Sequence, residues 1–147
     1  MKLSARARYG ARALLDLAIH SRANSTITLK EIAERQDISL SYLEHLVTPL
    51  IDGGIVRSIR GNKGGITLAK PAQSINLKQI INLLEGPTAL AECLVNPSTC
   101  ARSGDCVTQE VWAELGAAMD KVLESTTLQD LVERQNNKVS SKRMYYI

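Results

Sequence analysis

The 147-residue chain has no phenylalanine, one tryptophan and only two histidines, His20 and His45. Hydrophobic residues make up 44% of the chain, which is enough to build a core. Because aromatic residues are so few, that core must consist mostly of Leu, Ile, Val and Ala. No apolar run approaches the roughly 18 residues of a transmembrane helix. The chain has no phosphate-binding glycine motif and no Ser/His/Asp or metalloprotease pattern. We therefore expect a cytoplasmic protein that is not an enzyme and has no membrane partner.

Charge is unevenly distributed along the chain. Residues 1–70 hold 11 Lys and Arg against 6 Asp and Glu, whereas residues 71–147 hold 7 against 9. A basic first half joined to a mildly acidic second half favours a polyanionic partner for the first half, although chance asymmetry is the alternative. The basic N-terminus is not read as a signal peptide, because Arg12 and Asp16 interrupt its apolar residues.

Apolar spacing and N-cap residues predict three helices in the first 52 residues, at about 8–22, 29–36 and 40–52. Residues 23–27 are predicted to form a turn. The second helix begins with the capping-box pattern of Thr28 and Glu31, and the third begins after Ser39. Pro49 is expected to bend or divide the third helix. Two helices joined by a tight turn, with a packing helix before them, are typical of a helix-turn-helix domain.

A basic β-hairpin is predicted to follow. Gly53 and Gly54 should end the third helix with a left-handed residue, and strands are predicted at 55–59 and 66–69. The turn RGNKGG between the strands contains three glycines and the cations Arg60 and Lys63. This order is typical of a winged helix-turn-helix, whose second helix enters the major groove and whose wing reaches the DNA backbone or the minor groove. A helical domain with an ordinary hairpin is the alternative.

The second half is predicted to be helical. Asn76 caps a short helix that ends at Gly86, a long helix runs from 107 to 125, and Thr127 starts a short final helix. In the long helix, apolar residues follow coiled-coil spacing at Val111, Leu115, Ala118 and Val122. A single winged domain offers little to cover this stripe, so we expect a homodimer. The alternative is that the helix packs only on its own domain.

These expectations divide the chain into four parts. They are a winged DNA-binding domain at 1–85, a cysteine segment at 86–106, a dimerisation helix and short final helix at 107–135, and a disordered tail at 136–147. The predicted fold class is mainly α with a small β-hairpin wing: a winged helix-turn-helix plus a long dimerisation helix.

All three cysteines, Cys93, Cys100 and Cys106, lie in the cysteine segment. Clustered thiolates on a loop can converge on zinc or on an iron–sulfur cluster. An odd number of cysteines fits a disulfide framework poorly. Three unrelated thiols, a zinc-stabilised regulator and a thiol-based redox regulator are the alternatives, although three cysteines plus one oxygen would be unusual for structural zinc.

The segments MKLSARARYGARALLDLA, EIAERQDISLSYLEHLVTPL and GGIVRSIRGNKGGITLAK, together with the three cysteines, resemble the bacterial iron–sulfur cluster regulator family of IscR type. The resemblance covers about residues 1–135. It implies a homodimeric transcription factor or repressor that binds palindromic promoter sites and controls cluster-assembly genes. It also implies that Cys93, Cys100 and Cys106 bind a [2Fe–2S] cluster, with [4Fe–4S] left open.

The chain departs from that family at the fourth ligand. Well-known members have a histidine three residues after the last cysteine, where this chain has Gln109, and a nitric-oxide-responsive branch has an acidic residue where this chain has Arg8. Gln109, Glu110, Asp105 or a small exogenous molecule can supply an oxygen instead. A weak ligand set makes a cluster labile, which suits a sensor.

DNA-contacting residues are expected at the start of the third helix and on the wing. Ser41 can donate to bases or phosphate, and Glu44 can accept a hydrogen bond from cytosine. The resemblance implies that Glu44 is a selectivity switch between two classes of site, and that His45 replaces a usual glutamine. The full set is Ser39, Ser41, Tyr42, Glu44 and His45 on the helix, with Arg60 and Lys63 on the wing.

Overall fold

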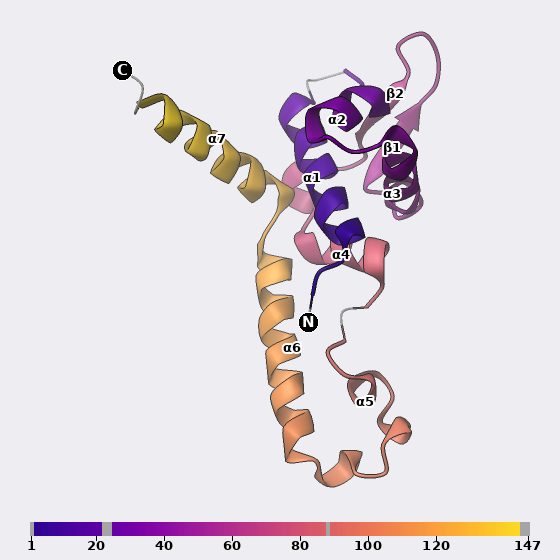
Figure 1. Ribbon diagram of the computed structural model, residues 1–147, viewed down its shortest axis with the longest axis vertical. Coiled ribbons are helices and arrows are strands. Elements are labelled where there is room, and N and C mark those ends of the chain that lie inside the picture. Colours follow the sequence, from indigo (N-terminus) through magenta and orange to yellow (C-terminus); the bar gives the residue numbers. More distant parts are fainter. Residues whose placement is uncertain (1, 22–24, 88, 145–147) are drawn as a thin grey trace.

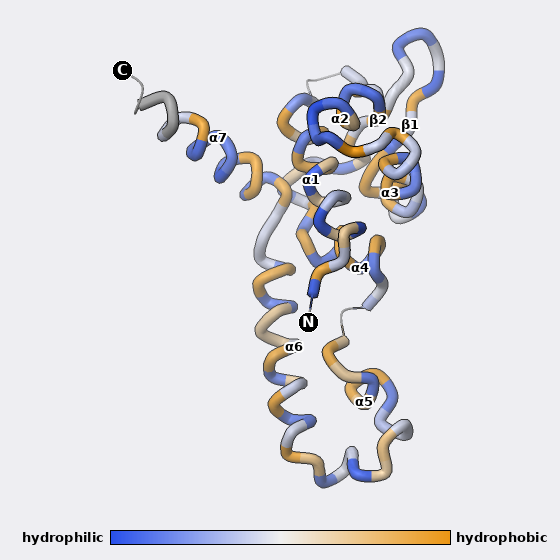
Figure 2. The backbone as a smooth tube through the Cα atoms, in the orientation of Figure 1, coloured by the Kyte–Doolittle hydropathy of each residue, from blue (hydrophilic) through white to orange (hydrophobic). Residues whose placement is uncertain are grey.

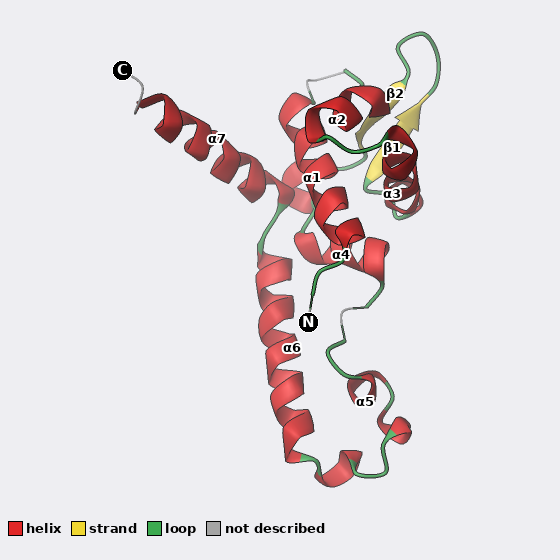
Figure 3. Ribbon diagram, in the orientation of Figure 1, coloured by secondary structure: helices red, strands yellow, loops and turns green. Residues whose placement is uncertain are grey.

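The computed structural model describes residues 2–21, 25–87 and 89–144. Its elements in chain order are α1 (Ala5–His20), α2 (Leu29–Gln36), α3 (Leu40–Asp52), β1 (Val56–Ile59), β2 (Gly65–Leu68), α4 (Leu77–Glu85), α5 (Glu92–Val95), α6 (Val107–Ser125) and α7 (Leu128–Met144), with short 3-10 turns at Ala72–Ser74, Pro97–Thr99 and Ser103–Asp105. Figure 3 shows the strands confined to one hairpin. The predicted class, mainly α with a small hairpin and a long helix, is confirmed. Within the described ranges, no helix combines the length and apolar character needed to span a membrane.

The helix-turn-helix forms where its cap residues predict it. The Thr28 hydroxyl accepts a hydrogen bond from the Glu31 N–H at 3.2 Å, and the Glu31 carboxylate accepts one from the Thr28 N–H at 2.7 Å. This bond lowers the pKa of Glu31. Asp37 turns the chain in the left-handed region (φ 52°), and Ser39 caps α3. Helix α3 is continuous through Pro49.

The wing is more extensive than the hairpin alone. Strands β1 and β2 pair from Val56↔Leu68 to Ile59↔Gly65, and the left-handed residue before them is Gly54 (φ 68°). Ile27, expected in a turn, instead pairs with Ile66 through two backbone hydrogen bonds of 3.0 and 2.8 Å. Gly65 permits this approach, because a Cβ there would lie 2.6 Å from the Ile27 carbonyl oxygen. Residues 22–24 of the predicted turn lie outside the described residues.

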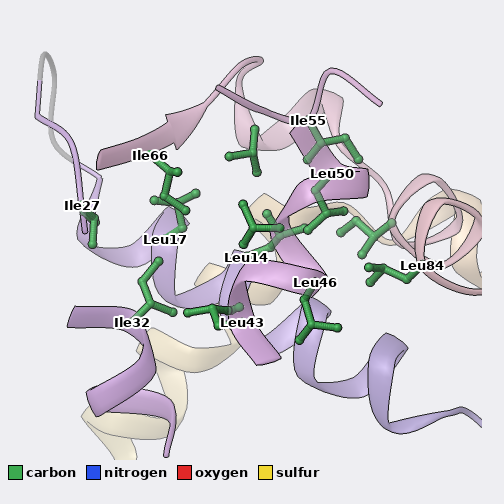
Figure 4. Close-up of a cluster of buried hydrophobic side chains, with 14 of the residues drawn as sticks. Leu14, Leu17, Ile27, Ile32, Leu43, Leu46, Leu50, Ile55, Ile66 and Leu84 are labelled. Carbon is green, nitrogen blue, oxygen red and sulfur yellow. The ribbon is translucent and has the colours of Figure 1, made fainter. Parts of the chain in front are cut away.

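One apolar core is shared by helices α1, α2, α3 and α4 and by the wing. Figure 4 shows side chains from these elements meeting in a single cluster. Its fully buried members are aliphatic, as predicted from the composition; they include Leu14, Leu17, Ile32, Leu43, Leu46, Leu50 and Ile55. This core fixes α3 and the wing relative to each other, and so fixes the predicted DNA-binding elements as one unit.

A buried ion pair also joins α1 to α2. Asp16 is 3% exposed and accepts hydrogen bonds from Arg35 at 2.7, 3.0 and 3.1 Å. Gln36 donates a further bond to Asp16 at 2.9 Å. The hydrogen bond to Asp16 raises the pKa of Arg35. The residue that interrupts the apolar spacing of α1 therefore anchors the helix before the turn.

The second half extends away from this domain (Figure 1). Asn76 caps α4 in a box with Gln79, and α6 covers the predicted 107–125. The prediction of a helix ending near 135 and a disordered tail from 136 is wrong as far as Met144, because α7 is helical to that residue. Asp130 and Thr127 cap α7, and Leu128 is fully buried. Extending a helix from such a fixed first turn costs little.

Candidate nucleic-acid interface and cysteine segment

Helix α3, the predicted recognition helix, presents a polar surface at its start. Ser41, Glu44 and His45 are exposed, as predicted for residues that contact DNA. Ser39 and Tyr42 have structural contacts as well. The Ser39 hydroxyl accepts from the Tyr42 N–H at 3.3 Å, and the half-buried Tyr42 ring packs edge-on against another tyrosine. Ser39 is exposed as well, so Tyr42 is the one predicted contact residue at the start of α3 that is half-buried.

The wing tip carries exposed cations on a glycine turn. Arg60 and Lys63 are both exposed, and Gly61 adopts φ 114°, a conformation that side chains rarely adopt. The Gly64 N–H donates to the Gly61 carbonyl at 2.8 Å, which closes the turn. Thr26 donates its hydroxyl to the Lys63 carbonyl at 2.6 Å. The wing tip is thus held to the rest of the domain while its two cations face solvent.

The structure also brings α1 to the start of α3, which the sequence did not predict. Tyr9 of α1 meets Tyr42 of α3 with ring centroids 6.1 Å apart and an interplanar angle of 87°. The guanidinium carbons of Arg8 and Arg12 lie 5.9 and 5.5 Å from the Tyr9 ring centroid. The only signal in the sequence is the run of cations before Asp16. The domain therefore has two basic elements, α1 and the wing, and α1 contacts the start of α3.

The cysteines lie at three places along the cysteine segment. Cys93 is in α5, Cys100 follows the Pro97–Thr99 turn, and Cys106 precedes α6. All three are free thiols, with Cys100 exposed and the other two half-buried. Among the described residues, no three His, Cys, Asp or Glu side chains gather closely enough to hold a metal ion. The donor types therefore suit a soft metal centre, and binding one would require the segment to close around it.

Hydrogen bonds favour the thiolate form of Cys106. Its sulfur lies 3.2 Å from the Thr108 hydroxyl oxygen, and this bond, with help from the Gln109 N–H, lowers the pKa of the thiol. Cys106 precedes the first turn of α6, where backbone N–H groups point toward an anion. The local structure therefore prepares this cysteine as an anionic ligand or a reactive thiol.

Gln109 connects α6 to the cysteine segment. Its side-chain amide donates to the Cys93 carbonyl oxygen at 2.9 Å, and its own N–H donates to the Cys106 carbonyl at 3.0 Å. The other proposed fourth ligands, Asp105 and Glu110, are exposed. Of the three candidates, Gln109 is the one whose side chain forms a hydrogen bond to the cysteine segment.

The apolar stripe of α6 faces solvent. No residue of α6 is buried, and Figure 2 shows hydrophobic positions recurring along its whole length. An apolar groove lies beside the stripe, lined by Leu3, Ala118, Met119, Val122 and Leu123. Burying such a surface against an apolar partner is favourable. Packing of α6 on its own chain, the alternative to a homodimer, occurs against α4 and α5 and leaves Val111 and Val122 exposed.

Helix α6 is fastened to the winged domain at one end. Lys78 of α4 contacts Asp120 at 3.0 Å and Glu124 at 2.6 Å, and the pKa of Lys78 is raised by its hydrogen bonds to Glu124 and Asp120. The Leu77 N–H donates to the Thr126 carbonyl at 2.9 Å. A movement of α6 therefore has a direct route into the domain that carries α3.

Known proteins resemble the chain along nearly all of its length. The Rrf2 family, described as an iron-dependent transcriptional regulator, matches residues 3–134. The protein Rrf2 of Nitratidesulfovibrio vulgaris is 39% identical over 132 residues, which cover 90% of this chain and 87% of that protein. The HTH-type transcriptional regulator IscR of Yersinia pseudotuberculosis is 35% identical over 136 residues, covering 92% of this chain and 82% of that protein.

Solved structures show the same architecture. CymR, the global cysteine regulator of B. subtilis, superposes with a TM-score of 0.77 and 36% identity, covering 91% of this chain and 98% of that one. IscR of T. potens gives a TM-score of 0.75 and 35% identity, covering 92% and 88%. An oxidised form of CymR from Staphylococcus aureus gives 0.73 and 38%, covering 90% and 97%. The similarity therefore extends to regulators named for different signals.

Proposed function

Because this chain belongs to the Rrf2 family of transcriptional regulators, we propose that it is a cytoplasmic, homodimeric DNA-binding regulator that senses iron–sulfur cluster status. In this proposal Cys93, Cys100 and Cys106 bind the cluster, and the targets are promoters of cluster-assembly genes. The observation that carries the proposal is the place of the cysteines. All three free thiols lie on the segment that joins the winged domain to the exposed helix α6.

DNA binding is supported by the arrangement of α3 and the wing. A recognition helix contacts base edges with residues of its N-terminal turns. Ser41, Glu44 and His45 are exposed there, and Arg60 and Lys63 are exposed on a wing that the same core holds. Glu44 is unfavourable beside phosphate unless a base donor meets it, so it is suited to discriminate between sites.

A dimer on a palindromic site is supported by α6. Its stripe of Val111, Leu115, Ala118 and Val122 has coiled-coil spacing and includes no buried residue. A second copy of the same helix offers a matching apolar surface, and a twofold dimer places two recognition helices on two half-sites. We therefore propose that α6 is the dimerisation helix.

The donor set fits an iron–sulfur cluster in its chemistry. Three free thiols are soft ligands, and Cys106 already has a lowered pKa. When bound, the cluster supplies a labile, redox-active centre whose presence reports iron and sulfide supply. We propose a [2Fe–2S] cluster, with [4Fe–4S] as the alternative, and an oxygen ligand from Gln109, Glu110, Asp105 or a small exogenous molecule.

Ordering of the cysteine segment gives the signal a route to the DNA. The segment leads directly into α6, and α6 is fastened to α4 by Lys78 and by backbone hydrogen bonds. Closing the segment around a ligand would therefore bias the position of α6 and of the winged domain. A small shift at Glu44 is enough to change which base donors it reaches.

A thiol-redox regulator without a cluster is the second candidate. The similarity to CymR, a cysteine regulator that has been solved in an oxidised form, favours it, as does the lowered pKa of Cys106. A zinc-stabilised regulator is a third candidate, although its ligand set would be unusual.

Anaerobic purification distinguishes these candidates. The proposal expects brown protein with matched iron and acid-labile sulfide and a visible absorption band, all lost in Cys93→Ala, Cys100→Ala and Cys106→Ala. Colourless protein with stoichiometric zinc would establish the zinc candidate. Metal-free protein whose DNA binding responds to reductant alone would establish the thiol candidate.

Gln109 variants then test the fourth ligand. If its oxygen faces the iron, Gln109→His should make the cluster last longer in air, since histidine is the better ligand. Gln109→Ala with unchanged spectrum and lifetime would exclude Gln109 and leave Glu110, Asp105 or an exogenous molecule.

A further inference from the structure

The N-terminal half of α1 and the residues before it carry charge of one sign. Residues 1–15 contain Lys2, Arg6, Arg8 and Arg12 and no acidic residue. The first acid of α1, Asp16, is buried and paired with Arg35. Glu85 of α4 accepts a hydrogen bond from the Ser4 N–H at 2.8 Å and is the acidic group that contacts the start of this segment. Arg12 donates hydrogen bonds to Gln36 and Arg8 contacts the Tyr9 ring, but within the described residues none of the four cations forms an ion pair, so their charge remains available to a partner.

Two of these cations are positioned beside the recognition helix. Arg8 and Arg12 both lie against the ring of Tyr9, which in turn packs on Tyr42 in the first turn of α3. Arg12 also donates to the Gln36 carbonyl at 2.9 Å and to its side-chain oxygen at 3.3 Å, at the end of α2. The guanidinium groups are therefore held near both the turn and the start of α3, on residues that stay exposed.

We propose that Arg8 and Arg12 form a phosphate-binding surface that contacts the DNA backbone flanking the major groove entered by α3. This inference rests on the proposed DNA binding and extends its footprint to a third element. The start of a recognition helix contacts base edges, so the sugar–phosphate chain passes beside it. Arginine guanidinium groups donate well to phosphate oxygens, and such contacts fix orientation without selecting sequence.

Arg8 and Arg6 offer a matched pair for the test. Both are exposed arginines of α1, but two residues of helix place their side chains roughly 200° apart around the axis. Of these two arginines, Arg8 is the one that contacts the Tyr9 ring. Loss of either removes the same charge, so a difference between them reports position and not net charge.

The experiment uses the full-length protein and two duplexes. One is enriched from a random-sequence library by the wild-type protein, and the other is a random duplex of equal length. Affinity is measured by fluorescence anisotropy over a range of KCl concentrations. Arg8→Gln should weaken binding to both duplexes by the same factor. It should also reduce the slope of log K against log salt by about 0.9 for each lost contact, or about 1.8 per dimer. Arg8→Lys should retain the slope, and Arg6→Gln should match the wild type.

The outcomes separate this inference from the proposed function. A wild-type slope in Arg8→Gln, or an equal reduction in Arg6→Gln, would overturn the phosphate surface while leaving DNA binding intact. Wild-type protein that binds neither duplex would overturn both proposals. Thermal unfolding of each variant checks the fold, and Arg8→Lys keeps the test valid if Arg8→Gln proves unstable, because a lysine that fails to restore the slope in a folded protein also contradicts the proposal.

Discussion

The winged domain and helix α6 bury their apolar side chains to different extents. In the domain the core residues are at most 8% exposed, whereas on α6 Val107, Val111 and Val122 are 72%, 51% and 62% exposed. The core of the domain therefore forms from its own elements together with Leu128 of α7. The apolar surface of α6 lacks a cover within the described chain, and this exposure is the basis for the proposed second subunit. We attribute DNA recognition to the first region and control of it to the second.

The largest expected effect comes from breaking the apolar stripe of α6. Leu115→Glu together with Val122→Glu should give a monomer, because carboxylates at the seam oppose pairing. The monomer should bind a palindromic duplex at least about 100-fold more weakly, since two linked half-sites reinforce each other. Sedimentation equilibrium and anisotropy measure the two effects.

Ala117→Glu is the control for this pair. Ala117 is exposed on the other side of α6, and a glutamate there pairs favourably with Lys121 four residues later. It should leave the dimer intact. A wild-type protein that sediments as a monomer at micromolar concentration would contradict the proposal that α6 is the dimerisation helix.

The ion pairs of the two regions should differ in their contribution to stability. Asp16→Asn leaves Arg35 facing an uncharged partner in a buried setting and should lower the free energy of unfolding by about 3 kcal/mol, the lower end for a buried pair because Arg35 is partly exposed. Lys78→Met breaks a pair that is open to solvent and should change the unfolding midpoint little. Urea denaturation compares them, and equal losses would contradict the distinction.

The cations of the two regions should differ in their contribution to DNA affinity. Arg60→Ala on the wing should weaken binding by about 1–3 kcal/mol if the side chain reads a base edge, and should reduce the salt slope if it contacts phosphate. Arg102→Ala in the cysteine segment should have no effect. Both variants remove one exposed arginine, so equal and negligible losses would exclude the wing from DNA binding.

The smallest expected effect is an acid dependence of the winged domain. The pKa of Glu31 is lowered from its ordinary 4.5 by hydrogen bonds from Thr28. A carboxyl with a lowered folded-state pKa stabilises the protein above its unfolded value and loses that contribution as the pH falls through the folded value. Glu31→Gln should therefore lower the melting temperature at pH 7 and reduce its further decrease toward pH 3. An identical pH profile for variant and wild type would show that the ionised carboxylate of Glu31 contributes nothing to stability.

Local signals predicted most of the helices. Thr28 and Ser39 mark the starts of α2 and α3 because their hydroxyls satisfy N–H groups of the first turn, an effect within three residues of chain. The long helix at 107–125 follows from its apolar period alone. These elements need no distant partner to be recognised.

Distant partners explain what sequence analysis missed. Ile27 looked like part of a turn, and it is extended because Ile66 pairs with it. Asp16 interrupts the apolar spacing of α1, and it is nevertheless buried because it pairs with Arg35. Helix α7 continues beyond its last regularly spaced apolar residues because its first turn is fixed by Leu128 and Asp130. For the candidate site, the residues of α3 and the wing were predicted, whereas Arg8 and Arg12 were not, since only the Tyr9–Tyr42 contact places them there.

The central claim is that occupancy of the cysteine segment changes which DNA is bound. The most direct measurement compares anaerobically purified wild type with the triple Cys93→Ala, Cys100→Ala, Cys106→Ala variant across duplexes enriched separately by each protein. We expect both to be dimers and both to bind, with relative affinities for the two classes of duplex that differ at least tenfold between the proteins, and with Glu44→Ala reducing that difference. Identical affinities of wild type and triple variant for every duplex would contradict the claim.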